Sequence, residues 1–118
     1  MAYNHIDIDF MDTFYDGNDE FKGKMISLFI EKSPDYMNDI IRYLEQKSLE
    51  DLAGVAHKFK ASIDFVGARK FKEVVTEIER NAKGGDLELI TDLVGSADAI
   101  WQEVISELKT ELLKLRPE

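Results

Sequence analysis

The sequence predicts an all-α protein, folded as an up-and-down antiparallel four-helix bundle with a short extra N-terminal helix. Apolar residues recur at intervals of three and four over long stretches, the spacing that places them on one face of a helix. The alternation of apolar and polar residues that strands require is absent over any useful length. Short turn signals separate the stretches, and short connections make consecutive helices antiparallel neighbours. A chain of 118 residues most economically forms one domain, residues 1–118.

The first half of the chain is expected to contain a short helix followed by a long helical region. Residues 16–19 combine a turn signal with an N-cap signal, so a helix should begin there. Ser33 and Pro34 supply an N-cap followed by a proline in a first helical turn, so the region either starts a new helix there or continues through a kink. The expected buried residues are Ile6, Ile8, Phe10 and Phe14 of the N-terminal helix, Phe21, Met25, Leu28 and Phe29 before Pro34, and Met37, Ile40, Ile41 and Leu44 after it.

Three further helices are expected in the second half. Residues 48–51 resemble a capping box, with Asp51 where glutamate is usual, and open a helix that ends near Gly67. The next helix runs over residues 68–82 and stops at the glycine pair 84–85, after which Asp86 caps a long final helix. The apolar stripes of the last two helices are Phe71, Val74, Val75, Ile78 and Ala82, and Ile90, Val94, Ala97, Trp101, Val104, Leu108, Leu112 and Leu115.

Composition and charge exclude several classes of function. The net charge of −9 argues against nucleic acid or an anionic membrane as partner. The chain has no cysteine, which excludes disulfides and thiol catalysis and is compatible with the cytoplasm. No run of residues approaches the length of a membrane span, and the N-terminus lacks the basic residues of a signal peptide. Between Leu52 and Lys72, however, five basic residues and one acidic residue give a local charge of +4.

Residues 53–68, within this basic segment, contain His57, one of two histidines in the chain. On a helix with about 100° of turn per residue, His57 lies opposite an apolar stripe and should therefore be exposed. Ala53 and Ala61 lie one turn below and above it, and Lys60 lies on the same side. The stripe consists of Leu52, Val55, Phe59, Ile63 and Val66.

An exposed imidazole has a neutral, nucleophilic nitrogen at cellular pH and needs no neighbouring base to activate it. A phosphoryl group on that nitrogen would add about two negative charges, which Lys60 could meet. Lys58, Arg69 and Lys70 would raise the local potential. A lone histidine in a helical domain is nevertheless more often an ordinary residue, so the composition of this stretch leaves its role open.

Other chemistries lack the necessary residues. His5 and His57 are too far apart in sequence to suggest a metal site, and the basic surroundings of His57 oppose a cation. Ser62 lies about 140° from His57 on the helix, so the two cannot form a hydrogen-bonded catalytic pair. The sequence also contains no glycine-rich phosphate-binding loop.

The run Ala56-His57-Lys58-Phe59-Lys60-Ala61-Ser62, followed by Val66-Gly67-Ala68 and Ile78-Glu79, resembles the histidine-containing phosphotransfer (HPt) domains of bacterial phosphorelays. Their motif reads His, any residue, Leu, Lys, Gly, Ser, with Gly-Ala ten residues after the histidine. The resemblance extends over essentially the whole chain. It departs from the motif at Ala61, where glycine is usual, and at Phe59, where leucine is usual.

The resemblance implies that His57 is the phosphoacceptor, that Lys60 stabilises the phosphoryl group and that Gly67 permits close packing. It assigns no firm role to Glu79. It further implies that the chain is a phosphocarrier without kinase activity and binds no cofactor or metal, because the partner receiver domain supplies Mg²⁺.

The implied partners are response-regulator receiver domains, and a hybrid histidine kinase is a further candidate. We expect a monomer in the cytoplasm. The alternative is a structural or adaptor bundle, or a phosphate-inactive HPt-like domain, that binds an acidic or receiver-type partner without phosphotransfer. The surface expected to contact a partner comprises Ala53, Lys58, Ala61, Asp64, Phe65 and Gly67.

Overall fold

The computed structural model describes residues 3–115 and contains no strand within them. Its helices confirm the predicted fold class of an α-helical bundle with a short N-terminal helix. Their bounds are Ile8–Phe14 (α1), Asp19–Glu45 (α2), Leu49–Asp64 (α3), Arg69–Gly84 (α4) and Leu87–Leu115 (α5).

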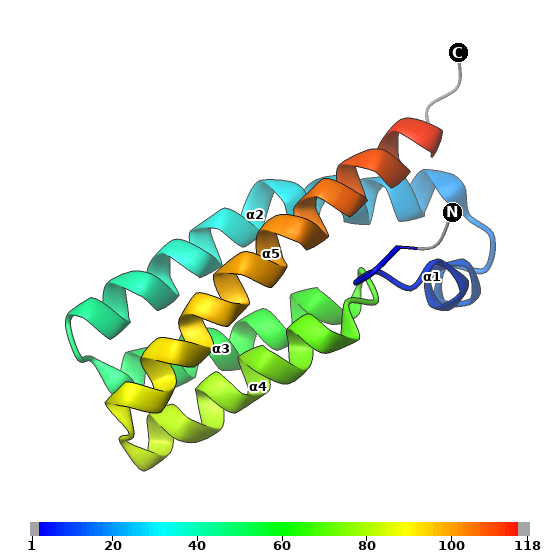
Figure 1. Ribbon diagram of the computed structural model, residues 1–118. Coiled ribbons are helices and arrows are strands. Elements are labelled where there is room, and N and C mark those ends of the chain that lie inside the picture. The colour runs from blue at the N-terminus through cyan, green and yellow to red at the C-terminus, as the bar shows by residue number, and fades with distance from the viewer. Residues whose placement is uncertain (1–2, 116–118) are drawn as a thin grey trace.

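Four helices close into an elongated bundle of 48 × 21 × 21 Å (Figure 1). Helix α2 packs against α3 and α5, and α4 packs against the same two helices from the other side. The long helices α2 and α5 extend past α3 and α4 at one end, where α1 lies beside the turn that joins α3 to α4 (Figure 1). In the described range 3–115, no helix is both long and apolar enough to cross a membrane.

Side chains near the helix ends explain most of the boundaries. The side chains of Asp7, Asn18 and Asp86 accept hydrogen bonds from backbone N–H groups in the first turns of α1, α2 and α5. Gly85 ends α4 in the left-handed conformation, with φ of 80°. At the start of α3 the predicted capping box is not formed, because the hydroxyl of Ser48 donates to the carboxylate of Asp51 at 2.6 Å.

Pro34 lies inside a single continuous helix, so the chain continues through the proline without starting a new helix at Ser33. Ser33 is buried, and its hydroxyl accepts a hydrogen bond of 2.8 Å from the indole of Trp101 on α5. The expected N-cap serine is instead part of the contact between α2 and α5.

The first part of α2 buries a different face from the one predicted. Phe21 and Leu28, both expected in the core, are 47% and 45% exposed. Phe10 and Phe14 of α1 are exposed as well. Ile6 is buried as predicted, and Met11 and Tyr15 join it in the core in place of the two phenylalanines. The residues that α2 buries are Lys22, Ile26, Phe29, Ser33, Met37 and Ile40.

Lys22 explains this change of face, because its buried side chain has two carboxylate partners from other helices. Its ammonium lies 2.8 Å from Asp12 of α1 and 3.3 Å from Glu111 of α5. Burial acts to lower the pKa of Lys22, but the hydrogen bonds and charges of Asp12 and Glu111 outweigh it and raise that pKa. This ion-pair cluster ties α1 to the bundle.

Candidate functional site

His57 lies near the middle of α3 with its side chain 70% exposed. The prediction that it points away from the core is therefore correct. Leu52, Phe59 and Ile63, on the opposite side of α3, are completely buried. Helical periodicity thus places the imidazole on the surface, while the buried residues on the other side of α3 hold the helix against the core.

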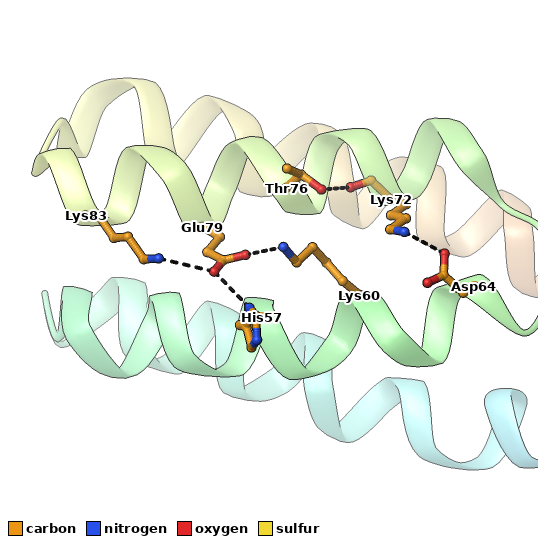
Figure 2. Close-up of polar contacts among 7 residues, drawn as sticks. All are labelled: His57, Lys60, Asp64, Lys72, Thr76, Glu79 and Lys83. Carbon is orange, nitrogen blue, oxygen red and sulfur yellow. Dashed lines mark hydrogen bonds and ion pairs between the residues drawn. The ribbon is translucent and has the colours of Figure 1, made fainter.

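A carboxylate on the neighbouring helix fixes the orientation of this imidazole. Glu79 of α4 points toward α3, and its Oε2 lies 3.0 Å from Nδ1 of His57 (Figure 2). Burial acts to raise the pKa of Glu79, but Lys60, with Lys83 and His57, outweighs it and keeps that pKa below its ordinary value. Because an ionised carboxylate only accepts hydrogen bonds, Nδ1 must carry the proton. In the neutral ring, the other nitrogen, Nε2, then carries the free electron pair.

Lys60 lies one turn beyond His57, as predicted, but its ammonium is already paired. It lies 2.6 Å from Oε1 of Glu79, and the side chain is 24% exposed. Lys83 approaches Oε2 of the same carboxylate at 3.4 Å (Figure 2). Glu79 therefore holds His57, Lys60 and Lys83 together across the seam between α3 and α4.

The burial of Glu79 could have been predicted from its place on α4, although its position in the motif did not indicate it. Glu79 lies four residues after Val75 and three before Ala82, on the buried stripe of α4, and it is 8% exposed. A carboxylate in such a place requires polar partners from another helix. Their identity depends on how α3 and α4 pack.

The other residues expected to contact a partner differ in their accessibility. Lys58 and Ala61 are exposed, and so is Asp64, which pairs with Lys72 of α4 at 2.7 Å. Ala53 is buried, at 7% exposed, although it lines an open hollow with His57. Ala53 itself is thus packed between α3 and α4, while the surface beside it and His57 stays open.

Phe65 and Gly67 lie near the far end of α3, where α1 covers the turn into α4. Phe65 is half-buried, and its backbone carbonyl accepts a hydrogen bond of 2.6 Å from the hydroxyl of Tyr15. Gly67 has φ of +64°, and a Cβ there would lie 2.9 Å from a ring carbon of Phe10. Gly67 lies in the turn after α3, ten residues after His57, so its local role is to allow α1 to pack closely.

Arg69 and Lys70 begin α4 at this same end and line a hollow with Gly67. Arg69 and Lys70 are thus twelve and thirteen residues after His57, whose surroundings they were expected to make positive. Near the imidazole, the cations are Lys60 and Lys83.

An exposed aromatic face, which the sequence did not reveal, lies on α1 and the start of α2. Phe14 stacks on Phe10 at 5.5 Å between ring centroids and meets Phe65 edge-on at 6.0 Å. Phe21 packs edge-on against Tyr15. We define the aromatic face as Phe10, Phe14, Phe21, Leu28 and Phe65.

Within residues 3–115 no group of three or more histidine, aspartate or glutamate side chains is arranged to hold a metal ion. His5 lies at the N-terminal segment, where its Nε2 is 3.1 Å from Glu103 of α5. It takes no part in the arrangement around His57.

Comparisons with known proteins bear on the family and the fold of the chain. A family model of the Hpt domain matches residues 24–116. Among solved structures, the chain is similar to histidine-containing phosphotransfer protein B (HptB) from Pseudomonas aeruginosa PAO1, with a TM-score of 0.89 and 19% sequence identity. That match covers 98% of this chain and 100% of the other. Comparison with curated protein sequences found no significant match. Because the family model matches most of its length, the chain belongs to the Hpt domain family of phosphotransfer proteins.

Proposed function

We propose that the chain is a phosphocarrier in which His57 accepts a phosphoryl group from a receiver-domain aspartate and passes it to another receiver. The observation that carries this proposal is the contact between Nδ1 of His57 and Glu79 at 3.0 Å. It leaves Nε2 with its electron pair on a side chain that is 70% exposed.

The transfer requires little more from this chain than a positioned nucleophile. The electron pair on Nε2 attacks phosphorus of the aspartyl phosphate, a P–N bond forms, and the P–O bond breaks with its electron pair remaining on the aspartate. The proton on Nδ1 stays in place, and Glu79 faces the positive charge that the ring acquires. The Mg²⁺ expected in the receiver would be bound by the receiver's own residues.

Lys60 supports this reading because its ammonium is one helical turn from the imidazole and on the same side. A phosphoryl group on Nε2 would carry about two negative charges, twice the charge of the carboxylate that Lys60 contacts in this structure. The ammonium of Lys60 would therefore move toward the phosphoryl group, and its contact with the carboxylate of Glu79 would weaken.

The aromatic face supplies a docking surface for the receiver. Exposed aromatic side chains are enriched at protein interfaces, and Phe65 directly follows α3, the helix that carries His57. Lys58 and Ala61 lie between them along α3 and are exposed. We expect a receiver to cover this part of α3 together with α1 and the start of α2. A hybrid histidine kinase could carry such a receiver, and a cytoplasmic location stays a prediction.

The direct test is incubation with a phosphorylated receiver, comparing His57→Gln with His5→Gln. The wild type and His5→Gln should take up phosphate that is labile to acid and stable to base, and His57→Gln should take up none. Uptake by His57→Gln equal to that of the wild type would contradict the assignment.

A second candidate is an adaptor that binds a receiver-type or acidic partner without phosphotransfer. The pairing of Lys60 with Glu79 favours it, because the cation expected at the phosphoryl site is already neutralised. An adaptor would bind a receiver equally well with or without the His57→Gln substitution, and the wild-type protein would never acquire phosphate.

A further inference from the structure

Glu79 is a buried carboxylate that three donors share. Its side chain is 11% exposed and lies 2.6 Å from the ammonium of Lys60, 3.0 Å from Nδ1 of His57 and 3.4 Å from the ammonium of Lys83. Charged groups face it from both helices of the seam, and Lys58 lies exposed on the outer side of α3. Removing this carboxylate would leave both lysines without their shared partner.

The two states of His57 place opposite demands on Lys60. When the imidazole is free, Lys60 neutralises Glu79 in a partly buried pair. When Nε2 carries a phosphoryl group, the same ammonium is drawn toward about two negative charges on the outer side of the ring. The carboxylate and the phosphoryl group therefore compete for one cation.

We propose that Glu79 is a positioning residue that competes with the phosphoryl group for Lys60 and thereby keeps phosphorylated His57 ready to donate. This inference rests on the proposed phosphotransfer at His57. This competition weakens the attraction between Lys60 and the phosphoryl group. When the phosphoryl group leaves, Lys60 and Glu79 form their full ion pair again. Glu79 thus shifts the equilibrium toward the free histidine and the phosphorylated receiver.

Transfer of the phosphoryl group from His57 to a receiver restores the ion pair between Lys60 and Glu79. The P–Nε2 bond breaks with its electron pair remaining on Nε2, while a carboxylate oxygen of the receiver forms the new bond to phosphorus. The proton stays on Nδ1, where Glu79 accepts its hydrogen bond, so the imidazole leaves as a neutral ring. The ammonium of Lys60 then returns fully to Oε1 of Glu79.

The test compares Glu79→Gln with Glu77→Gln. The glutamine at 79 keeps an oxygen that can accept from Nδ1 but loses the charge that attracts Lys60. Glu77 lies on the same helix, where it pairs with Arg80, and it makes no contact with His57 or Lys60. Both variants therefore carry the same chemical change, but only one of them alters the site.

The measurements are the ratio of phosphorylated histidine to phosphorylated receiver at equilibrium and the lifetime of the phosphohistidine. We expect Glu79→Gln to raise the ratio about fivefold to tenfold, as the loss of one competing ion pair would, and to lengthen the lifetime. Glu77→Gln should match the wild type in both. A ratio for Glu79→Gln equal to that of Glu77→Gln would overturn the proposal.

Two further measurements separate the possible causes. In the Lys60→Met background, Glu79→Gln should no longer raise the ratio, because only its direct contact with the imidazole is then altered. A full fivefold increase there would show that Glu79 does not act through Lys60. In the wild type, the NMR signals of the Lys60 side chain should shift on phosphorylation with a small phosphoramidate donor. Unchanged Lys60 signals in fully phosphorylated protein would also overturn the proposal, even if Glu79→Gln did not fold.

Failure of the proposed function would look different from failure of this inference. If wild-type His57 takes no phosphate from either the receiver or phosphoramidate, phosphotransfer itself is wrong. If the wild type is phosphorylated normally and the Glu79 variant transfers as the wild type does, only the role of Glu79 is wrong.

Discussion

At the scale of single residues, the site depends on one carboxylate that sets the state of its neighbours. Glu79 determines which nitrogen of His57 holds the proton and which group Lys60 contacts. Such a role requires a charge in a place where water is largely excluded, because a carboxylate in open solvent would hold neither partner firmly.

Replacing Lys60 with alanine should slow phosphotransfer about tenfold or more without unfolding the bundle. The reason is the loss of the cation nearest to the developing charge on the phosphoryl group. Single-turnover transfer from a phosphorylated receiver measures the effect. Lys109→Ala, which removes an exposed lysine of α5, is the matched control. Equal rates for the two variants would remove Lys60 from the mechanism.

Replacing Gly67 with alanine should lower the free energy of unfolding by about 1–2 kcal/mol, because a side chain is strained at positive φ. The added methyl would also meet Phe10 of α1. Urea unfolding measures the change. Gly95→Ala is the control, since nothing lies within 4 Å of a Cβ there, and it should stabilise α5 slightly. Similar effects at both positions would contradict the packing role of Gly67.

At the scale of helices, α1 connects the ends of α2 and α3. Tyr15 donates its hydroxyl proton to the carbonyl of Phe65, and Asp12 pairs with Lys22. Burial raises the pKa of Tyr15 to about 12, so this hydroxyl remains a donor throughout the physiological range. These contacts hold the aromatic face in a fixed position relative to the helix that carries His57.

If the aromatic face binds receivers, Phe14→Ala should weaken binding about tenfold, as expected for an aromatic side chain at the centre of an interface. Calorimetric titration with a receiver measures the dissociation constant. Leu113→Ala removes an exposed apolar side chain of α5 and should leave the affinity unchanged. An unchanged affinity for Phe14→Ala would show that the receiver contacts another surface.

The helices could be predicted because their signals are local. The ends of α3 and α5 predicted from the apolar spacing and the turn signals lie close to the observed ends, and Gly85 and Asp86 marked the boundary between α4 and α5. The face that α2 buries could not be found this way. It depends on Lys22, whose burial is possible only because Asp12 and Glu111 reach it from two other helices.

At the scale of the whole molecule, the exposure of His57 followed from the sequence, whereas the surroundings of its nitrogen atoms did not. A helical wheel shows the side of one helix on which a residue lies. It does not show that Glu79 of α4 crosses to α3, or that Phe10, Phe14 and Phe65 meet at one end of the bundle. Such contacts arise from packing between elements.

The stability of the fold should depend on pH through Glu79. Because its pKa in the folded protein lies below the ordinary value of 4.5, its contribution is present above that pH and is lost as pH falls below it. Glu79→Gln should therefore be less stable than the wild type by on the order of 1–2 kcal/mol at pH 7. Urea unfolding at pH 7, 5 and 3 should show this difference shrinking only at the lowest pH. A difference that stays constant down to pH 3 would contradict the account.

The central claim is that His57 accepts the phosphoryl group on the nitrogen that faces away from Glu79. NMR of protein labelled with ¹⁵N in its histidines, before and after phosphorylation by a receiver, tests it most directly. We predict a proton on Nδ1 in the free protein and a bond from phosphorus to Nε2 of His57 after transfer, with His5 unchanged. Phosphate on Nδ1 of His57, on His5, or on no histidine would contradict the account.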